Sequence, residues 1–365
     1  MGMNSTKFGG LERFMIELIK ANPDIPFVLV YESYPISLEY RDLLRNNKVE
    51  IEVISFNTSG IISQFRNYCR IIKKYSPEIV HFHFTLNELG ALAARFCGVK
   101  RVYKTVHSCL TNNNSPIENS SQLSIGQHIR FLGGLFVRLY TRIIFVSQYT
   151  KNQYERLFGA LPSYAVVYLG TRRCDSIGKT IDNASLNIPL KSKVITSVLF
   201  SHPMKGADVL IKALPDLAEC CTLVLIGLDD SPYTNELHAL AEELGVSGRI
   251  RWVGITDNVS QYLSLTDVYV QPSRTEALSL ASCEALSYGI PVVASDVGGL
   301  PEVASFVFET ENSSKLAEEI NLLLSDEILY ERVSLEAVER YNKLFRLENS
   351  IYNYSLLYIM QSYDY

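Results

Sequence analysis

The sequence lacks the features that mark several large classes of protein. No apolar run is long enough to cross a membrane, and the first twenty residues contain charged side chains instead of the apolar core of a signal peptide. The net charge of −5 provides no basic field for nucleic acid. The 7 cysteines are odd in number and form no C-x-x-C pair, which disfavours a disulfide framework or a zinc site. These absences predict a cytoplasmic protein with reduced thiols and no nucleic-acid partner.

The chain has the length and apolar content of a protein with two cores. Its 365 residues exceed one typical domain, and 47% of them are hydrophobic. Short β-rich runs alternate with helix-length segments in two series, which the polar stretch 171–189 separates. Such alternation predicts parallel sheets with helices on both faces. We therefore predict an α/β fold of two doubly wound, Rossmann-like domains, residues 1–172 and 173–347, with a helical tail at 348–365.

The expected elements follow from the apolar periodicity. The strands are expected at 27–31, 49–54, 79–82, 101–106, 143–146, 165–168, 194–199, 222–226, 250–253, 268–271 and 291–294. Helices are expected at 11–21, 87–97, 147–157, 207–220, 232–244 and 280–288. The whole tail 336–365 is expected to be helical, because its apolar residues recur at helical spacing and would form one buried face: Leu344, Leu347, Ile351, Tyr354 and Tyr358.

The most informative segment is Pro272–Val303, which directly follows the expected strand 268–271. Ligands of open α/β sheets bind at the carboxyl ends of the strands. Glu276 precedes an expected helix, and Ala277–Ser279 would open that helix with unpaired amides that suit a diphosphate or sugar oxygen. Glu284 follows eight residues later, which corresponds to about 12 Å of helical rise. The two carboxylates are then too far apart for a hydrolytic pair, but they can bind hydroxyls at two ends of one ligand.

Two glycine-containing loops lie where a phosphate could bind. Lys205 and Gly206 follow the expected strand 194–199, and a lysine there can offset the charge of a departing diphosphate. Gly9 and Gly10 feed the first expected helix, and glycine lets the backbone approach a phosphate closely. A solvated lysine and an ordinary turn are the alternatives, which these residues alone leave open.

Histidines gather at the ends of two expected strands. His107 directly follows the strand 101–106, while His81 and His83 flank the end of the strand 79–82. A histidine at this edge can face a ligand, although an isolated histidine is as often structural. No acidic or cysteine residue has the spacing of a metal partner, so we interpret His81 and His83 as lining or structural residues.

Taken in register, these motifs resemble the signature of glycosyltransferase family 4. The pattern E-x7-E, then A-L-x-x-G-x-P-V-V-A-S and G-G-x-P-E, runs from Glu276 to Glu302, with K-G at Lys205 and G-G-x-E at Gly9. The resemblance implies a GT-B fold, in which two Rossmann-like domains face across a cleft and the last helix returns to the first domain. It implies catalytic roles for Glu276, Lys205 and His107, and donor binding by Gly9, Gly10, Gly206, Ala277, Leu278, Ser279 and Glu284.

The sequence departs from the family pattern at three places. Phe200 stands where the family has an arginine of the phosphate clamp, and Ala277–Ser279 replaces the usual Gly-Phe-Gly. The family places a β-strand before the first glycine turn, whereas this chain has only Met1–Phe8 there and no β-rich run. We therefore expect a disturbed or incomplete sheet in the first domain.

The resemblance also implies a reaction. We expect a retaining transfer of a hexose from a UDP-sugar or GDP-sugar to a glycan or lipid-linked glycan acceptor, in bacterial surface polysaccharide synthesis. No Asp-x-Asp motif is visible, so we expect no metal and no cofactor. An NAD-dependent dehydrogenase is disfavoured because no G-x-G-x-x-G follows a strand, while a non-catalytic nucleotide-sugar-binding relic remains an alternative.

One segment concerns location. Residues 127–142 mix large apolar and basic side chains, a combination that suits the surface of an anionic membrane and equally a helix buried on one side. Peripheral contact with the inner face of the plasma membrane is therefore one of two expectations for this segment.

Overall fold

The computed structural model describes residues 9–31, 33–35, 37–54, 60–83, 88–112, 115–116, 133–161, 163–173 and 182–359. The chain divides into two compact units. Unit 1 comprises Met1–Asn112, Ile117–Gly170 and Leu347–Tyr365, and unit 2 comprises Asn113–Pro116 and Thr171–Arg346. Each unit is described below by itself.

Unit 2 contains a six-stranded sheet in the order β11-β10-β9-β12-β13-β14, and every pair in it is parallel. Its strands are β9 (Lys193–Val198), β10 (Cys221–Ile226), β11 (Ile250–Gly254), β12 (Val268–Gln271), β13 (Val292–Ser295) and β14 (Phe306–Phe308). The helices are α7 (Ala207–Ala213), α8 (Pro232–Glu243), α9 (Val259–Leu263), α10 (Leu280–Ser287), α11 (Leu300–Val303), α12 (Ser313–Ser325) and α13 (Glu327–Arg340). Strand β12 lies between β9 and β13, so the loop that follows it starts from the middle of the sheet.

The sheet of unit 2 is covered on both faces because alternate residues of its strands enter different cores. Leu223 and Leu225 of β10 pack in the cluster that includes residues of α7 and α12. Val224 and Ile226, which alternate with them, belong to a second cluster against which Val259 and Tyr262 of α9 pack. Burial on both faces explains the nearly continuous apolar run of this strand.

In unit 1, the described strands form two parallel sheets, β1-β2 and β3-β4-β7-β8. These strands are β1 (Val28–Tyr31), β2 (Glu50–Val53), β3 (Ile79–His83), β4 (Arg101–Val106), β7 (Arg142–Phe145) and β8 (Tyr164–Val166). Of two further short strands, β5 (Thr111–Asn112) belongs to unit 1 and β6 (Ser115–Pro116) to unit 2. The helices are α1 (Gly10–Ala21), α2 (Leu38–Asn46), α3 (Ile61–Tyr75), α4 (Glu88–Phe96), α6 (Gln148–Phe158) and α14 (Leu347–Ile359). Residues 1–8, on which the expectation of an incomplete sheet rests, lie outside the described residues.

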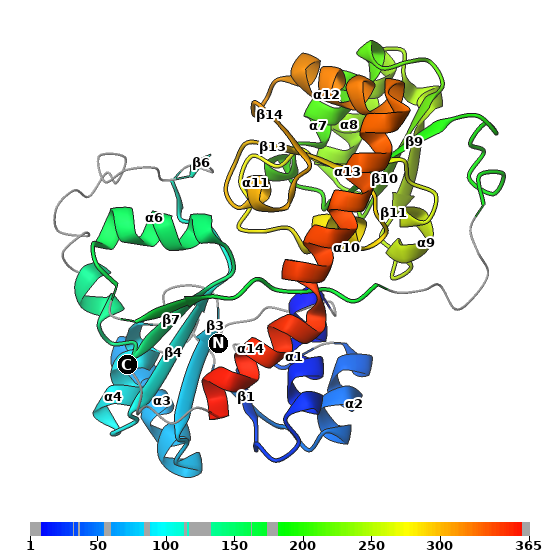
Figure 1. Ribbon diagram of the computed structural model, residues 1–365. Helices are drawn as coiled ribbons and strands as arrows, with labels where there is room; N and C mark the ends of the chain where they lie inside the picture. The colour runs from blue at the N-terminus through cyan, green and yellow to red at the C-terminus, as the bar shows by residue number, and fades with distance from the viewer. Residues whose placement is uncertain are drawn as a thin grey trace. The chain divides into compact units, whose positions relative to one another are not determined.

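The helix α14 packs within unit 1, alongside α1 (Figure 1). The rings of Tyr354 and Phe14 meet edge to face at 5.2 Å, and Ser355 accepts a hydrogen bond from Asn22 at 2.8 Å. Arg101 of β4 donates to the carbonyl oxygens of Leu357 and Tyr358, near the end of the helix. A cation is favourable there because the last carbonyls of a helix carry partial negative charge.

The predicted α/β class with two Rossmann-like units is confirmed, and the structure corrects three helices. The tail is not one helix, because α13 runs into a short π-helix (Tyr341–Phe345) and Arg346 is extended before α14 begins. The expected helix 207–220 ends early, since Pro215 lies in a 3-10 turn. Helix α10 begins at Leu280, so Ala277–Ser279 precede it rather than open it.

Candidate active site

The loop between β12 and α10 carries Glu276 at the carboxyl edge of the sheet of unit 2. A 3-10 turn, Pro203–Lys205, follows β9, the strand next to β12, and therefore ends at the same edge. Lys205 Nζ donates to Glu276 Oε2 at 2.5 Å, and both side chains are less than a fifth exposed. The ring of Phe200 lies 4.9 Å from the same ammonium. The two charges that the sequence assigned to the donor site thus form one ion pair.

Two glycines allow the loops around Glu276 to pack against one another. Gly206 has φ +69°, and a Cβ there would lie 1.9 Å from the carbonyl oxygen of Pro272. Gly298 has φ +59°, and a Cβ there would lie 1.7 Å from the carbonyl oxygen of Glu276. The amide of Gly299 donates to that same oxygen at 3.0 Å. These contacts explain why glycine is required at both positions, independently of any ligand.

Arg274 fastens the two loops from the outside. Its guanidinium donates two hydrogen bonds of 2.9 Å to the carboxylate of Asp208, in the first turn of α7, and also bonds to Glu311. Its amide donates to the carbonyl of Met204 at 2.8 Å, in the turn that carries Lys205. This bidentate pair lowers the pKa of Asp208 through its hydrogen bonds and charge, although burial alone would raise it. The sequence reasoning assigned no role to Arg274.

The second carboxylate, Glu284, lies inside α10 and is half-buried. Because residues 276–279 are not helical, the rise of 1.5 Å per residue does not apply across the whole interval from Glu276. The predicted separation of two helical turns is therefore wrong, and Glu284 is little more than one turn into the helix. Both carboxylates nevertheless contribute to the raised pKa of the buried Tyr269, after the larger effect of burial.

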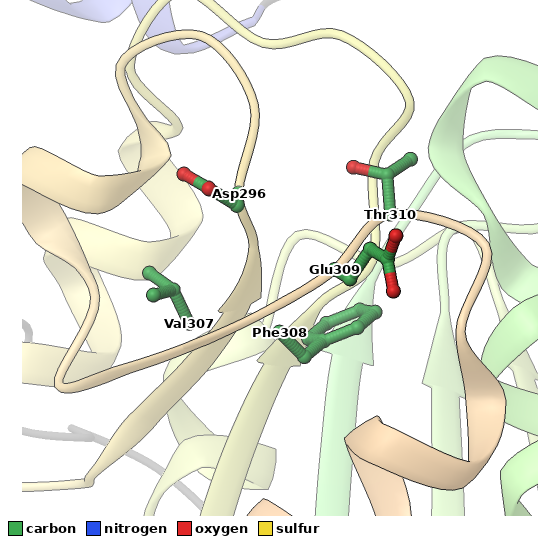
Figure 2. Close-up of a pocket in the computed structure, with 5 residues that line it drawn as sticks. All are labelled: Asp296, Val307, Phe308, Glu309 and Thr310. Atoms are coloured by element: carbon green, nitrogen blue, oxygen red, sulfur yellow. The ribbon is translucent and has the colours of Figure 1, made fainter.

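A hollow of about 420 Å³ lies at the same edge, at the ends of β13 and β14. Asp296, Val307, Phe308, Glu309 and Thr310 line it. Figure 2 shows Asp296 across the opening from Thr310. With two carboxylates and no cation among its lining residues, the hollow suits hydroxyl groups better than a diphosphate.

In unit 1, three imidazoles meet at the ends of β3 and β4. His83 Nδ1 lies 2.9 Å from His107 Nε2, and their rings are stacked. His81 bonds through its two nitrogens to Tyr358 and Thr105, at 2.8 Å each. Burial lowers the pKa of His107 and of His81 to about 3 and that of His83 well below its usual range. All three rings are therefore neutral at physiological pH, and in the pair His83–His107 one ring donates while the other accepts.

Gly9 and Gly10 lie at the start of α1. Gly9 is the extended N-cap residue, and its amide donates to the carboxylate of Glu12 at 3.1 Å. Glu12 is buried, with 7% of its surface exposed. A carboxylate at this position satisfies a helix-start amide and the positive end of the helix dipole. A phosphate that binds this turn would compete with Glu12.

Two protein-family models match the chain, and the boundary between their matches lies close to the boundary between the two units. A model described as Glycosyltransferase Family 4 matches residues 8–172, and one described as Glycosyl transferases group 1 matches residues 178–340. The chain belongs to glycosyltransferase family 4. Its predicted assignment is thereby confirmed.

This family 4 glycosyltransferase is 28% identical, over 282 residues, to a GDP-mannose-dependent alpha-(1-6)-phosphatidylinositol monomannoside mannosyltransferase of Mycobacterium tuberculosis. That match covers 70% of this chain and 69% of the relative. An uncharacterized glycosyltransferase of Methanocaldococcus jannaschii is 24% identical over 94% of this chain and 92% of its own length.

Solved structures of other glycosyltransferases share the fold. HepE of Anabaena in complex with UDP has a TM-score of 0.78 at 19% identity, over 97% of each chain. The apo lipopolysaccharide outer core galactosyltransferase WaaB has a TM-score of 0.72 at 15% identity, over 98% of this chain and 97% of that chain. The glycosyltransferase described here therefore has the GT-B fold.

The structure also bears on the predictions about location and about the cysteines. None of the helices within the described ranges is long and apolar enough to pass through a bilayer. Of the basic segment 127–142, residues 127–132 lie outside the described residues. The described cysteines, which exclude Cys174, are all free of disulfides.

Proposed function

We propose that the chain transfers a hexose from a UDP-sugar or GDP-sugar to a glycan or lipid-linked glycan acceptor, with retention at the anomeric carbon, in bacterial surface polysaccharide synthesis. The pair Lys205–Glu276 carries the proposal. It places one cation and one anion 2.5 Å apart at the carboxyl edge of the sheet, on two loops that glycine contacts hold together. This is the edge at which α/β folds bind nucleotides.

In the proposed reaction, the ammonium of Lys205 turns from Glu276 to the diphosphate and offsets the charge that develops as it leaves. Glu276 accepts hydrogen bonds from hydroxyls of the donor sugar, and Glu284 accepts them from the ribose. The bond between the anomeric carbon and the phosphate oxygen breaks, and a bond to the acceptor oxygen forms. The acceptor proton passes to the departing phosphate oxygen, so no side chain needs to act as a base.

We propose that Lys205 exchanges Glu276 for the diphosphate when the donor binds. A half-buried ammonium without its carboxylate would be costly, and Glu276 satisfies Lys205 until the donor arrives. Gly206, Ala277, Leu278 and Ser279 would surround the diphosphate with backbone, and Gly9, Gly10 and His107 would contact the donor from unit 1. We propose no metal or cofactor in this step, and unchanged turnover in EDTA would support that.

The nucleotide of the donor is the first point to test. A relative is named GDP-mannose-dependent, and HepE was solved with UDP-glucose. Thermal unfolding of the purified chain in a panel of UDP- and GDP-sugars should show one base that raises the melting temperature, since a ligand of the native state stabilises it. No shift with any sugar nucleotide would contradict the proposal.

Transfer itself separates an enzyme from a non-catalytic relic. The chain should release UDP or GDP from the preferred donor, and NMR of the product should show the anomeric configuration of the donor. Release should be lost in Glu276→Gln, which keeps the shape of the side chain and removes its charge. Binding without any release by the wild type would favour the relic instead.

We further propose that unit 1 touches an anionic membrane where a lipid-linked acceptor would lie. Helix α3 exposes Ile61 and Ile62, by 73% and 69%, and its exposed residues Arg66 and Arg70 continue one face from Ile62. The protein should sediment with vesicles containing phosphatidylglycerol more than with phosphatidylcholine alone. Changing both isoleucines to serine should release it, whereas serine at Ile328, 82% exposed in unit 2, should not.

A further inference from the structure

A buried amide lies behind the loop that carries Glu276. Gln271 ends β12 and is 1% exposed. Its Oε1 accepts hydrogen bonds from Tyr269 Oη and Ser279 Oγ, at 3.0 Å each, and its Nε2 donates to Ser273 Oγ at 2.9 Å. Both lone pairs of the amide oxygen and one of its two amino hydrogens are thus in use. An amide so placed would be expensive to bury without these partners.

The two serines bound by Gln271 flank Glu276 at three residues on either side. Ser273 Oγ lies 3.5 Å from Glu276 Oε2, and the carbonyl of Ser273 accepts a hydrogen bond from Ser295 at 2.5 Å. Gln271 therefore binds both ends of the segment 273–279 from inside the unit. The contacts of Gly298 and Arg274 hold the same segment from other sides.

Ser279 needs such a partner because its backbone is strained. Its φ is +82°, in the region that glycine enters freely and a residue with a Cβ does not. Its Oγ accepts from the amide of Ser282 at 3.2 Å, which caps α10, and donates to Gln271. The side chain is thus held on both sides while the backbone turns into the helix. Strain of this kind persists only where surrounding contacts enforce it.

We propose that Gln271 is a positioning residue for the glycosyl transfer: it holds Ser279 in its strained conformation and, through Ser273 and Ser279, keeps Glu276 aligned with Lys205. The inference rests on the function proposed above. Without the amide, Ser279 relaxes and the segment 273–279 shifts, so that Glu276 no longer meets the donor sugar in the geometry of the transition state. Such a shift of the segment lowers turnover more than it lowers the affinity for the donor.

The first test is Gln271→Leu, which keeps the side-chain volume and removes the hydrogen bonds. We expect kcat to fall about 30-fold with KM changed less than threefold. Thr196→Val is the matched control, because it also breaks a buried hydrogen bond. The hydroxyl of Thr196, in β9, lies 2.6 Å from that of Thr266, which precedes the first residue of β12. The control should lose a similar amount of thermal stability and keep its kcat.

The second test uses Ser279 and avoids a change in the core. Ser279→Ala and Ser279→Gly both lose the bond to Gln271, but only alanine keeps a Cβ at positive φ. We expect kcat of Ser279→Ala to lie about 10-fold below that of Ser279→Gly. Adding Ser279→Gly to Gln271→Leu should recover several-fold of the lost kcat, because glycine no longer needs a partner.

The outcomes separate the two proposals. A wild type that neither transfers nor hydrolyses any donor refutes the proposed function. Hydrogen exchange in full-length protein then still tests Gln271, since peptides spanning 273–279 should exchange faster in Gln271→Leu than in wild type or Thr196→Val. Unchanged exchange there, or an active Gln271→Leu with kcat within twofold of wild type, overturns the positioning role. Equal kcat in Ser279→Ala and Ser279→Gly also overturns it.

Discussion

The candidate site residues of the two units differ in charge: those of unit 2 are ionised, and the histidines of unit 1 are neutral. In unit 2, Lys205 and Glu276 form an ion pair that is half-buried at the edge of the sheet. In unit 1, His81, His83 and His107 are buried with lowered pKa values and hydrogen-bonded as neutral rings. Among these candidate residues, the charged side chains therefore lie in unit 2 and the neutral hydrogen-bonding rings in unit 1.

Unit 1 also has an ion pair, and its burial differs. Lys104 Nζ lies 3.3 Å from Glu88, with side chains only 4% and 15% exposed, and 5.2 Å from the ring of Tyr140. Burial lowers the pKa of Lys104 more than Glu88 raises it. Such a pair is enclosed by core residues and cannot be exchanged for a ligand, which distinguishes it from Lys205–Glu276.

The largest expected effect is loss of the Lys205 ammonium in unit 2. Lys205→Met should lower kcat by about 1,000-fold, because a cation positioned to stabilise the leaving group contributes that much in comparable sites. Lys212→Met is the matched control, since Lys212 is a more exposed lysine of the same unit that pairs with Asp208 at 3.2 Å. Turnover of Lys205→Met within tenfold of the control would refute a role in catalysis.

The next effect concerns packing around Glu276. Gly298→Ala should cost about 3 kcal/mol more stability than Gly245→Ala, because both have positive φ but only the first Cβ would strike a carbonyl. At Gly245, with φ +69°, no atom lies within 4 Å of the added Cβ. Urea denaturation of the two variants measures the difference. Equal midpoints would show that the loop containing Gly298 moves aside without cost.

These cases show which parts of the structure the sequence can reveal. Apolar runs that alternate with helix-length segments predicted the parallel sheets of both units. Strands buried on two faces appear in the sequence as short continuous apolar segments. Strand β14, Phe306–Phe308, is not among the predicted strands. The motif from Glu276 to Glu302 predicted a donor loop, and the structure shows that Gly298 of this motif packs against the carbonyl of Glu276.

The arrangement behind that loop could not be predicted. Gln271 reads as the polar end of a buried strand, and nothing in its neighbours shows that it bonds to Ser273 and Ser279. The contact between Lys205 and Glu276 depends on β9 and β12 being neighbours, which spacing along the chain does not state. The positive φ of Ser279 was hidden for the same reason, because a serine there predicts an ordinary helix cap.

A smaller effect should be a difference between the two units in how their stability falls at acid pH. The pKa values of His81, His83 and His107 are lower in the folded protein than in the unfolded chain, so between about pH 6.5 and pH 3 the unfolded chain binds more protons and stability falls as pH falls. Each of the three histidines should contribute a loss on the order of 2 kcal/mol between pH 7 and pH 5. In unit 2, both histidines, His202 and His238, are exposed.

Hydrogen exchange of the intact chain at pH 7 and pH 5, corrected for the intrinsic rate, measures this difference by unit. Peptides of β3, β4 and α14 should lose protection at the lower pH, and those of β9 and β12 should keep theirs. Equal losses in both units would show that the buried imidazoles do not control acid stability.

The smallest predicted effect tests whether unit 1 contributes more than structure. His83→Phe and His107→Phe break the same 2.9 Å bond and leave one buried imidazole without its partner, so they should destabilise unit 1 similarly. If His107 also donates to the donor sugar, kcat/KM should fall about 10-fold further in His107→Phe, which corresponds to one hydrogen bond. Steady-state kinetics at saturating acceptor provides the comparison. Because the pKa of His107 is about 3, its contribution should not vary between pH 6 and pH 8. Equal kcat/KM values in the two variants would confine His107 to a structural role and leave the chemistry to unit 2.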